Sequence, residues 1–173
     1  MKMTPLGQGP DMSSVILGLM RIAAMEDTAI RALYDTARDA GITFFDHADI
    51  YTFGKAEQVF GRVLQQRPEL REQISLQSKC GIRFADANTV QRYDFSAAWI
   101  QQSVDNILAR LQTEQLDILL LHRPDPLMQA EEVAEVFARL QRAGKVQHFG
   151  VSNMQHHEMA LLQDALSNPL VAY

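Results

Sequence analysis

The sequence has one cysteine, Cys80, among its 173 residues. A single thiol excludes a disulfide within the chain and the zinc sites that need several cysteines. The sequence also lacks a long apolar run, since no stretch approaches the roughly 18 apolar residues of a membrane-spanning helix. Its first residues contain no apolar core of a secretory signal. We therefore expect a cytoplasmic protein that does not enter a membrane.

Basic residues are too few to make an electrostatic site for nucleic acid. Lysine and arginine number 16 against 21 acidic residues, which gives a formal net charge of -5 at pH 7. An acidic surface repels both phosphate backbones and anionic lipid. The hydrophobic fraction of 47% is typical of a folded chain that buries a core. We expect a small-molecule partner, and neither nucleic acid nor membrane.

Short apolar runs alternate with longer amphipathic stretches, and no linker interrupts the alternation. Glycines at 41 and 144 mark helix ends, while Asp27 or Thr28 and Ser96 are candidate N-terminal caps. This pattern predicts one domain over residues 1–173, built from βα units. The predicted strands are 15–22, 42–48, 74–80, 116–122, 146–152 and 170–173. The predicted helices are 27–40, 55–66, 96–111, 129–142 and 155–166.

Alternating βα units allow either a doubly wound sheet or a (β/α)8 barrel. Polar residues at the carboxyl ends of four different predicted strands favour the barrel, because catalytic residues gather on that rim. A doubly wound nucleotide-binding sheet would favour a glycine-rich turn after its first strand, where Gly18 stands alone. We predict an α/β fold of the (β/α)8 TIM-barrel type, incomplete, with about six strands and five helices.

The predicted rim collects four residues whose chemistry is complementary, Asp46, Tyr51, Lys79 and His122. A tyrosine hydroxyl is a weak acid, and a nearby ammonium makes it a better proton donor by stabilising the phenolate. A carboxylate beside that ammonium would hold it in place, and a histidine could donate a hydrogen bond to a carbonyl oxygen. Such a site can protonate a carbonyl oxygen while a nicotinamide supplies hydride to the carbon.

Four motifs of this chain resemble those of the aldo-keto reductases, and of a bacterial subgroup among them. They are D-x-A-x-x-Y at 46–51, S-K at 78–79, an apolar run that ends in His122, and G-V-S-N at 150–153. The resemblance begins near Val15 and covers nearly all of the chain after it. It implies a barrel enzyme that reduces an aldehyde or a ketone to an alcohol with NADPH.

The resemblance also implies a role for each site residue. Tyr51 would be the general acid, Lys79 and Asp46 the charge pair that tunes it, and His122 the donor that orients the substrate carbonyl. Further residues would contact the cofactor. Ser152 and Asn153 match the positions that bind the nicotinamide carboxamide, and Met20 and Arg21 match positions that line the cofactor.

The family barrel has eight strands, and the last apolar run of this sequence corresponds to the sixth. The remaining nicotinamide contacts and the pyrophosphate and 2'-phosphate sites of the family follow that strand. We therefore expect unpaired edges on the first and sixth strands. We also expect self-association or pairing with a complementing C-terminal half, and weak or undetectable NADPH binding with little turnover by this chain alone.

Two other functions stay open at this point. A metal-dependent barrel hydrolase would use Asp46, His47, Asp49 and His122 as ligands, although adjacent strand residues point to opposite faces. A noncatalytic NADPH-sensing or interaction module would keep the barrel shape without turnover. Cys80 is either a reactive thiol beside Lys79 or a buried apolar residue, and the second is favoured.

Overall fold

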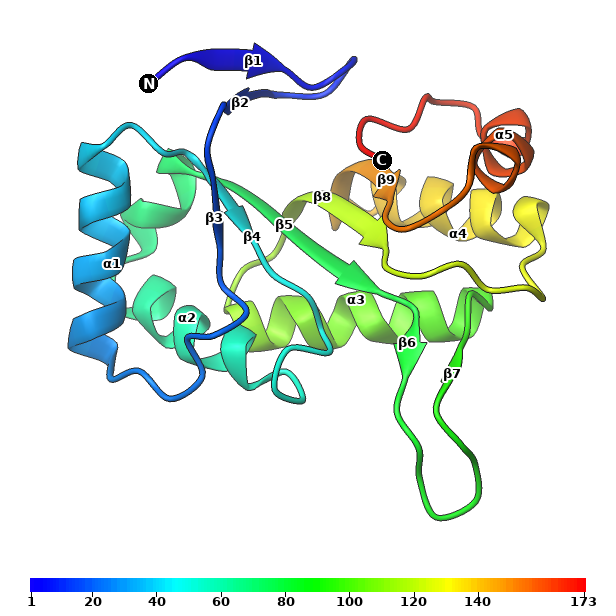
Figure 1. Ribbon diagram of the computed structural model, residues 1–173, viewed down its shortest axis with the longest axis horizontal. Helices are drawn as coiled ribbons and strands as arrows, with labels where there is room; N and C mark the ends of the chain where they lie inside the picture. The colour runs from blue at the N-terminus through cyan, green and yellow to red at the C-terminus, as the bar shows by residue number, and fades with distance from the viewer.

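The computed structural model describes all 173 residues, and a parallel sheet lies at its centre (Figure 1). Its order in space equals its order along the chain, whereas a doubly wound sheet reverses direction at a switch point. The predicted barrel-type arrangement is therefore present. The five strands are β3 (Ile16–Gly18), β4 (Phe44–Asp46), β5 (Ser75–Cys80), β8 (Leu116–Leu121) and β9 (Val146–Val151).

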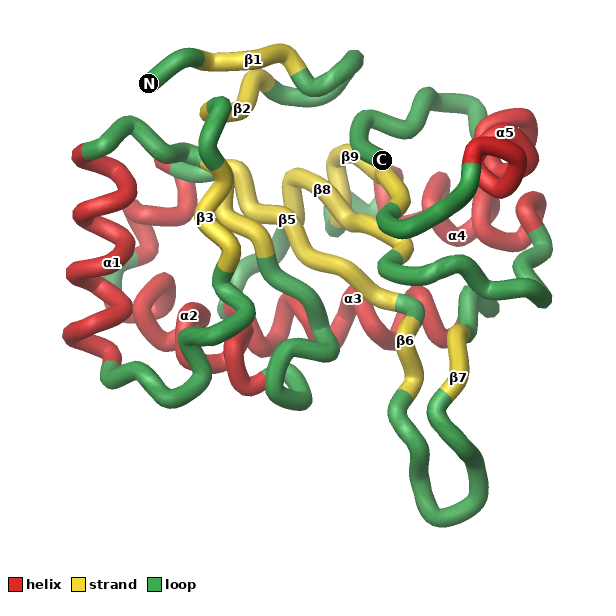
Figure 2. Tube along the Cα trace, viewed as in Figure 1, coloured by secondary structure: helices red, strands yellow, loops and turns green.

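Helices follow the outer face of the curved sheet (Figure 2). Each predicted helix exists within two residues of its predicted bounds. The first four helices carry an apolar stripe with three or more buried residues, whereas the last helix buries only Leu162 and begins at a capping box. A short 3-10 turn, η1 (Pro68–Gln73), was not predicted. The five helices are α1 (Asp27–Asp39), α2 (Lys55–Gln66), α3 (Ala97–Leu111), α4 (Ala130–Arg142) and α5 (His156–Ala165).

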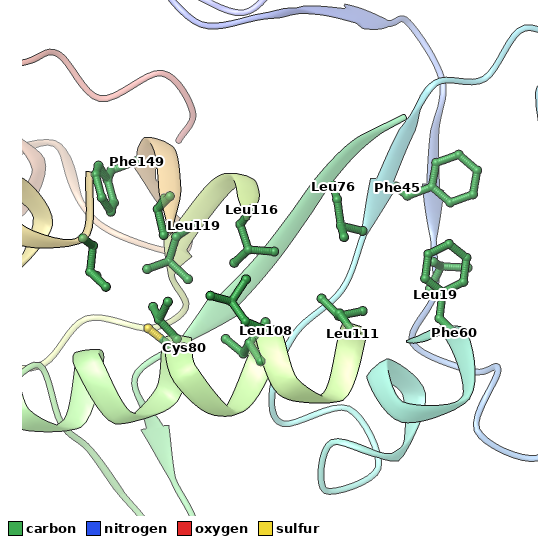
Figure 3. Close-up of a cluster of buried hydrophobic side chains, with 14 of the residues drawn as sticks. Leu19, Phe45, Phe60, Leu76, Cys80, Leu108, Leu111, Leu116, Leu119 and Phe149 are labelled. Atoms are coloured by element: carbon green, nitrogen blue, oxygen red, sulfur yellow. The ribbon is translucent and has the colours of Figure 1, made fainter. Parts of the chain in front are cut away.

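A cluster of 33 buried apolar residues fills the space between sheet and helices. Figure 3 shows Phe45 of the sheet near Phe60 of α2, Leu76 above Leu111 of α3, and Leu119 above Leu108 of α3. Their strand neighbours point to the opposite, inner face, where a smaller apolar cluster forms. Both faces of the sheet are therefore covered in places, which explains why the strands read as nearly continuous apolar runs.

Two hairpins of the structure were not predicted from the sequence. The first pairs β1 (Met3–Pro5) with β2 (Asp11–Ser13) at the N-terminus, and the second pairs β6 (Ile82–Arg83) with β7 (Arg92–Tyr93). The second hairpin projects away from the sheet (Figure 1). These strands are only two or three residues long, too short to show the alternation by which a strand is recognised.

The structure corrects three details of the prediction. The run at 170–173 forms only one parallel bridge, between Gly150 and Ala172, and not a full strand. The first strand ends at Gly18, so residues 19–22 lie in the turn that follows. Glu26, and neither Asp27 nor Thr28, is the N-cap of α1, because the Asp27 carboxylate pairs with Arg62 at 2.7 Å.

The outer strands of the sheet have free edges. Strand β3 pairs only with β4, and β9 pairs with β8 and with the single bridge to Ala172. Val15 and Ile16, at the β3 edge, are 48% and 43% exposed. Self-association through these edges stays a prediction. None of the helices has both the length and the apolar character needed to cross a membrane.

Candidate active site

The polar residues predicted for the rim lie at the carboxyl ends of adjacent strands. Asp46 is the last residue of β4, Lys79 is the fifth of six in β5, and His122 directly follows β8. The parallel register places Asp46 beside Gln77 and Lys79 beside Leu120. The sheet therefore brings together side chains that are up to 76 positions apart, from 46 to 122, in the sequence.

The Lys79 ammonium is the centre of this group. Its Nζ atom lies 2.6 and 2.7 Å from the two carboxylate oxygens of Asp46, 2.8 Å from the backbone oxygen of His47 and 3.2 Å from the Tyr51 hydroxyl. Only 7% of Lys79 is exposed, so these contacts replace the water that the ammonium would otherwise bind. Asp46 compensates the charge of the ammonium, and Tyr51 adds a hydroxyl contact.

Gln77 also belongs to this site, although it was not predicted from the sequence. Its side-chain amide donates to Asp46 Oδ1 at 2.5 Å. The alternation of side chains along a strand could have predicted it, because a residue two positions before Lys79 projects from the same face. Gln77 therefore orients the carboxylate that orients the lysine.

Tyr51 lies in the turn between β4 and α2, and this turn has an unusual backbone. Thr52, Phe53 and Gly54 have φ angles of 50°, 57° and 80° in succession. Two of the three are not glycine, and each such residue in the left-handed region costs about 1 to 3 kcal/mol. Strain of this kind persists only where surrounding contacts hold it. The turn directs the Tyr51 hydroxyl toward Lys79 and sets its ring edge-on to His122, with centroids 6.2 Å apart.

The His122 ring is partly buried and lacks a partner for one nitrogen. Its Nδ1 atom is buried without a hydrogen bond. Burial, aided by the positive charges of Lys79 and Arg123, lowers the pKa of His122 to about 4. The imidazole is therefore neutral near pH 7, and a neutral ring can still donate one hydrogen bond to a carbonyl oxygen.

The charge of His122 can be followed by NMR. We expect its ring protons to titrate with a midpoint near pH 4 in place of 6.5, because burial disfavours the imidazolium. A His122→Gln variant would identify the resonance. A midpoint at or above 6.5 would show that His122 is charged near neutral pH, contrary to the burial seen here.

The two predicted carboxamide-binding residues follow β9 and are tied to the His122 turn. The Asn153 side-chain amide donates to the backbone oxygen of His122 at 3.0 Å and to Ser152 Oγ at 2.8 Å. Both residues line an open hollow of about 600 Å³ on the inner side of the sheet, together with Gln77. Polar donors and acceptors thus stand beside a space large enough for a planar ring.

Met20 and Arg21 lie in the turn after β3, and both are exposed. Neither makes a hydrogen bond or an ion pair with Asp46, Tyr51, Lys79 or His122. The structure therefore places Met20 and Arg21 on the same rim but does not bring them into the cluster. Their predicted contact with a cofactor stays a prediction.

His47 and Asp49 do not join Asp46 in a metal site. His47 points to the helix side of the sheet and packs against Phe60, with ring centroids 5.1 Å apart. Asp49 has a buried Oδ1 atom without a hydrogen bond, and burial followed by the charge of Glu57 raises its pKa to about 7. No group of three or more candidate ligand side chains could hold a metal ion. Asp46, His47, Asp49 and His122 therefore do not form the ligand group that the hydrolase hypothesis needs.

Cys80 also points to the helix side, where it belongs to the large apolar cluster and is fully buried. Burial raises the pKa of its thiol well above the ordinary value, so the nucleophilic thiolate is disfavoured. The interpretation of Cys80 as a reactive thiol is wrong. The alternative interpretation, a buried small apolar residue, is correct.

Buried His47 makes stability sensitive to acid. Both ring nitrogens lack partners, and burial together with the Lys79 charge lowers the pKa of His47 from 6.5 to about 3. Between these values only the unfolded chain takes up the proton. Stability is therefore fully present above pH 6.5 and is lost as the pH falls toward 3.

We expect His47→Leu to raise the free energy of unfolding by about 1 to 3 kcal/mol, because it removes polar atoms that are buried without partners. The variant should also lose less stability than the parent between pH 7 and pH 4. Urea denaturation at several pH values measures both effects. A variant that is less stable than the parent at neutral pH would show that the imidazole has partners not seen here.

The chain is similar in sequence to proteins of one known family. Residues 14–173 match the sequence pattern described as Aldo/keto reductase family. The chain is 40% identical over 169 residues to oxidoreductase YdhF of Escherichia coli, covering 95% of this chain and 57% of that protein. It is 39% identical over 169 residues to a 6-dehydroglucose reductase of Agrobacterium fabrum, covering 93% of this chain and 57% of that protein.

A solved structure with a similar fold is the aldo-keto reductase AKR11C1 from Bacillus halodurans in its holo form. The TM-score is 0.84 at 29% sequence identity, over 96% of this chain and 55% of the other. The chain thus spans little more than half the length of the relatives that it matches. Over that span, the fold is similar to the corresponding part of that reductase.

Proposed function

Because the chain belongs to the aldo/keto reductase family, we propose that it carries the catalytic site of an NADPH-dependent reductase that converts an aldehyde or a ketone to an alcohol. One observation carries the proposal. The buried Lys79 ammonium contacts both the Asp46 carboxylate and the Tyr51 hydroxyl, at 2.6 and 3.2 Å. A phenol, an ammonium and a carboxylate in this order are the parts of a tuned proton donor.

In the proposed mechanism the Tyr51 hydroxyl donates its proton to the carbonyl oxygen as negative charge develops there. When bound, the nicotinamide supplies hydride to the carbonyl carbon. Lys79 stabilises the tyrosinate that remains, and Asp46 keeps the ammonium in position. Neutral His122 donates a hydrogen bond to the same oxygen and so fixes the direction from which the carbonyl approaches Tyr51.

Ser152 and Asn153 fit a carboxamide, because a hydroxyl and an amide offer both the donors and the acceptors that this group needs. They line the hollow that Gln77 also lines. A nicotinamide bound there would lie near the rim that carries Tyr51, the proposed proton donor. We propose that they fix the nicotinamide, with Met20 and Arg21 along its outer side. The preference for NADPH over NADH rests on the family.

The proposal extends to the setting of the chain. We propose that residues 1–173 act as one domain, because one apolar cluster includes residues from Leu19 to Leu162. We also propose that the protein works in the cytoplasm on a small carbonyl compound. Relatives named 6-dehydroglucose reductase are 39% and 38% identical to this chain, so oxidised sugars are candidate substrates.

The test follows the consumption of NADPH by the 173-residue chain in the presence of an aromatic aldehyde, an oxidised sugar or a simple ketone. Binding of NADPH is measured separately from the quenching of protein fluorescence. Because this chain alone is expected to bind NADPH weakly, we expect slow consumption at high NADPH concentration that depends on the carbonyl compound. Saturable NADPH binding without turnover of any of them would contradict the proposal and favour the noncatalytic module.

A further inference from the structure

A second charged cluster lies behind the rim, on the helix side of β5. The Glu57 carboxylate of α2 accepts from Ser78 Oγ at 2.6 Å and from Arg110 Nε of α3 at 2.7 Å. Glu57 is completely buried, and the Arg110 side chain is 21% exposed. Neither residue touches Asp46, Tyr51 or His122 in any hydrogen bond, so the proposed reaction does not use this cluster directly.

A buried ion pair needs an explanation other than stability. Taking a carboxylate out of water is costly, and burial raises the pKa of Glu57 even though Arg110 and Ser78 act in the opposite direction. Apolar residues of similar volume often serve stability as well or better. The cost of burying Glu57 therefore suggests that the ion pair positions a neighbouring segment. The contacts of Arg110 show which segment this is.

The Arg110 side chain rests directly on the backbone at the end of the Tyr51 turn. Gly54 has a φ angle of 80°, and a Cβ atom added there would lie 2.7 Å from both Cδ and Nε of Arg110. Gly54 is the N-cap of α2, and Glu57 lies in the first turn of that helix. Arg110 thus packs against Gly54, the last residue of the left-handed segment, and Glu57 holds Arg110 in place.

The same cluster reaches the backbone that carries the lysine. Ser78, the residue before Lys79, donates to Glu57, so the carboxylate joins β5 to the first turn of α2. The Asp49 backbone N–H also donates to the Lys79 backbone oxygen at 3.0 Å. Two connections therefore run between the segment that carries Tyr51 and the strand that carries Lys79, one on each side of the turn.

We infer that Glu57 and Arg110 are positioning residues that hold the Tyr51 hydroxyl against the Lys79 ammonium. Without the Arg110 side chain over Gly54, only the Phe53 ring, which packs on Phe84 with centroids 4.4 Å apart, still holds the left-handed segment by a side-chain contact. The end of the turn next to α2 is then freer to relax toward ordinary backbone angles. Without the charge on Glu57, Arg110 has no anchor. The inference rests on the proposed function only for its effect on turnover, since the geometry of Tyr51 can be measured without it.

The direct test is fluorine NMR of the chain in which its four tyrosines carry fluorine. Tyr51→Phe assigns the resonance of Tyr51, and Lys79→Met shows how far that resonance moves when the ammonium is lost. We expect Glu57→Gln and Arg110→Met each to shift the Tyr51 resonance in the direction seen in Lys79→Met, or to broaden it. The resonances of the other three tyrosines should stay in place.

Two matched controls separate positioning from general loss of stability. Arg62→Met breaks an ion pair of the same helix, with Asp27 at 2.7 Å, and the Arg62 side chain makes no hydrogen bond to the turn. Val63→Ala removes buried apolar volume from the same helix. Both should leave the Tyr51 resonance unchanged. An unchanged resonance in both Glu57→Gln and Arg110→Met would overturn the inference, as would an equal shift in the controls.

Turnover supplies a second measurement. We expect Arg110→Met to lower kcat about 100-fold, as a misplaced catalytic group does, with KM for NADPH unchanged and partial rescue in Arg110→Lys. If the parent chain shows no turnover, the proposed function fails, while a shifted Tyr51 resonance still supports the positioning role. If kcat and the resonance are both unaffected in a parent that turns over, the positioning role fails and the proposed function stands.

Discussion

Replacing Tyr51 with phenylalanine is expected to lower the rate of carbonyl reduction by about 100- to 10,000-fold, the range for loss of a general acid. The substitution removes one oxygen atom. That oxygen accepts a single hydrogen bond, from Lys79 at 3.2 Å, and no other hydrogen bond reaches the side chain. The ring stays edge-on to His122, so the shape of the site is kept while its proton donor is lost.

The measurement is NADPH consumption with the best carbonyl substrate of the panel, together with NADPH binding by fluorescence. Binding should be unchanged, because Ser152 and Asn153 do not depend on the Tyr51 hydroxyl. Tyr93→Phe is the matched control, since Tyr93 lies on the projecting hairpin and its hydroxyl makes no hydrogen bond within the chain. Full activity in Tyr51→Phe would show that the proton comes from another group, and the proposed mechanism would be wrong.

Replacing Gly61 with alanine is expected to lower the free energy of unfolding by about 3 kcal/mol, at the upper end of the usual cost of overpacking. A Cβ atom at position 61 would overlap the backbone oxygen of Arg110 and lie 2.8 Å from the backbone carbon of Leu111. Backbone atoms cannot turn aside as a flexible side chain can, so helices α2 and α3 would have to separate.

The sign of the change in unfolding free energy distinguishes a closely packed glycine from an open one. Glycine within a helix is ordinarily less favourable than alanine by about 0.5 to 1 kcal/mol, so a site without the close approach would be stabilised by the same change. Gly18→Ala is the control, because no atom beyond its two chain neighbours lies within 4 Å of its added Cβ. Urea denaturation compares the two. A Gly61→Ala protein as stable as its parent would contradict the close contact of α2 with α3.

The repeating pattern of the fold could be predicted from the sequence because each signal is local. A helix with a marked apolar stripe, such as α2, shows its period within a dozen residues, and Gly41 and Gly144 adopt the positive φ angles of 80° and 71° expected after a helix end. Ser96 accepts from the Trp99 backbone N–H as its position before α3 predicted. The short hairpins gave no such signal.

The site could be predicted in part for a related reason. Parallel strands in sequential order bring their carboxyl ends to one rim, so residues at those ends meet wherever the order is kept. Lys79 and Asp46 meet in this way, and the alternation of a strand correctly sent His47 to the other face. The same alternation places Gln77 on the face of Lys79, but Gln77 was not predicted.

The sequence by itself determined the order of strands and helices, the family and the residues of the rim, because these depend on local periodicity and on motifs. Only the tertiary structure decided how far each group is buried and what it touches. Burial by distant segments gives His47 and Asp49 their altered pKa values, and packing of α3 on α2 places Arg110 over Gly54. Contacts between residues more than fifty positions apart, such as Glu57 with Arg110, depend on how the helices pack and leave no local mark in the sequence.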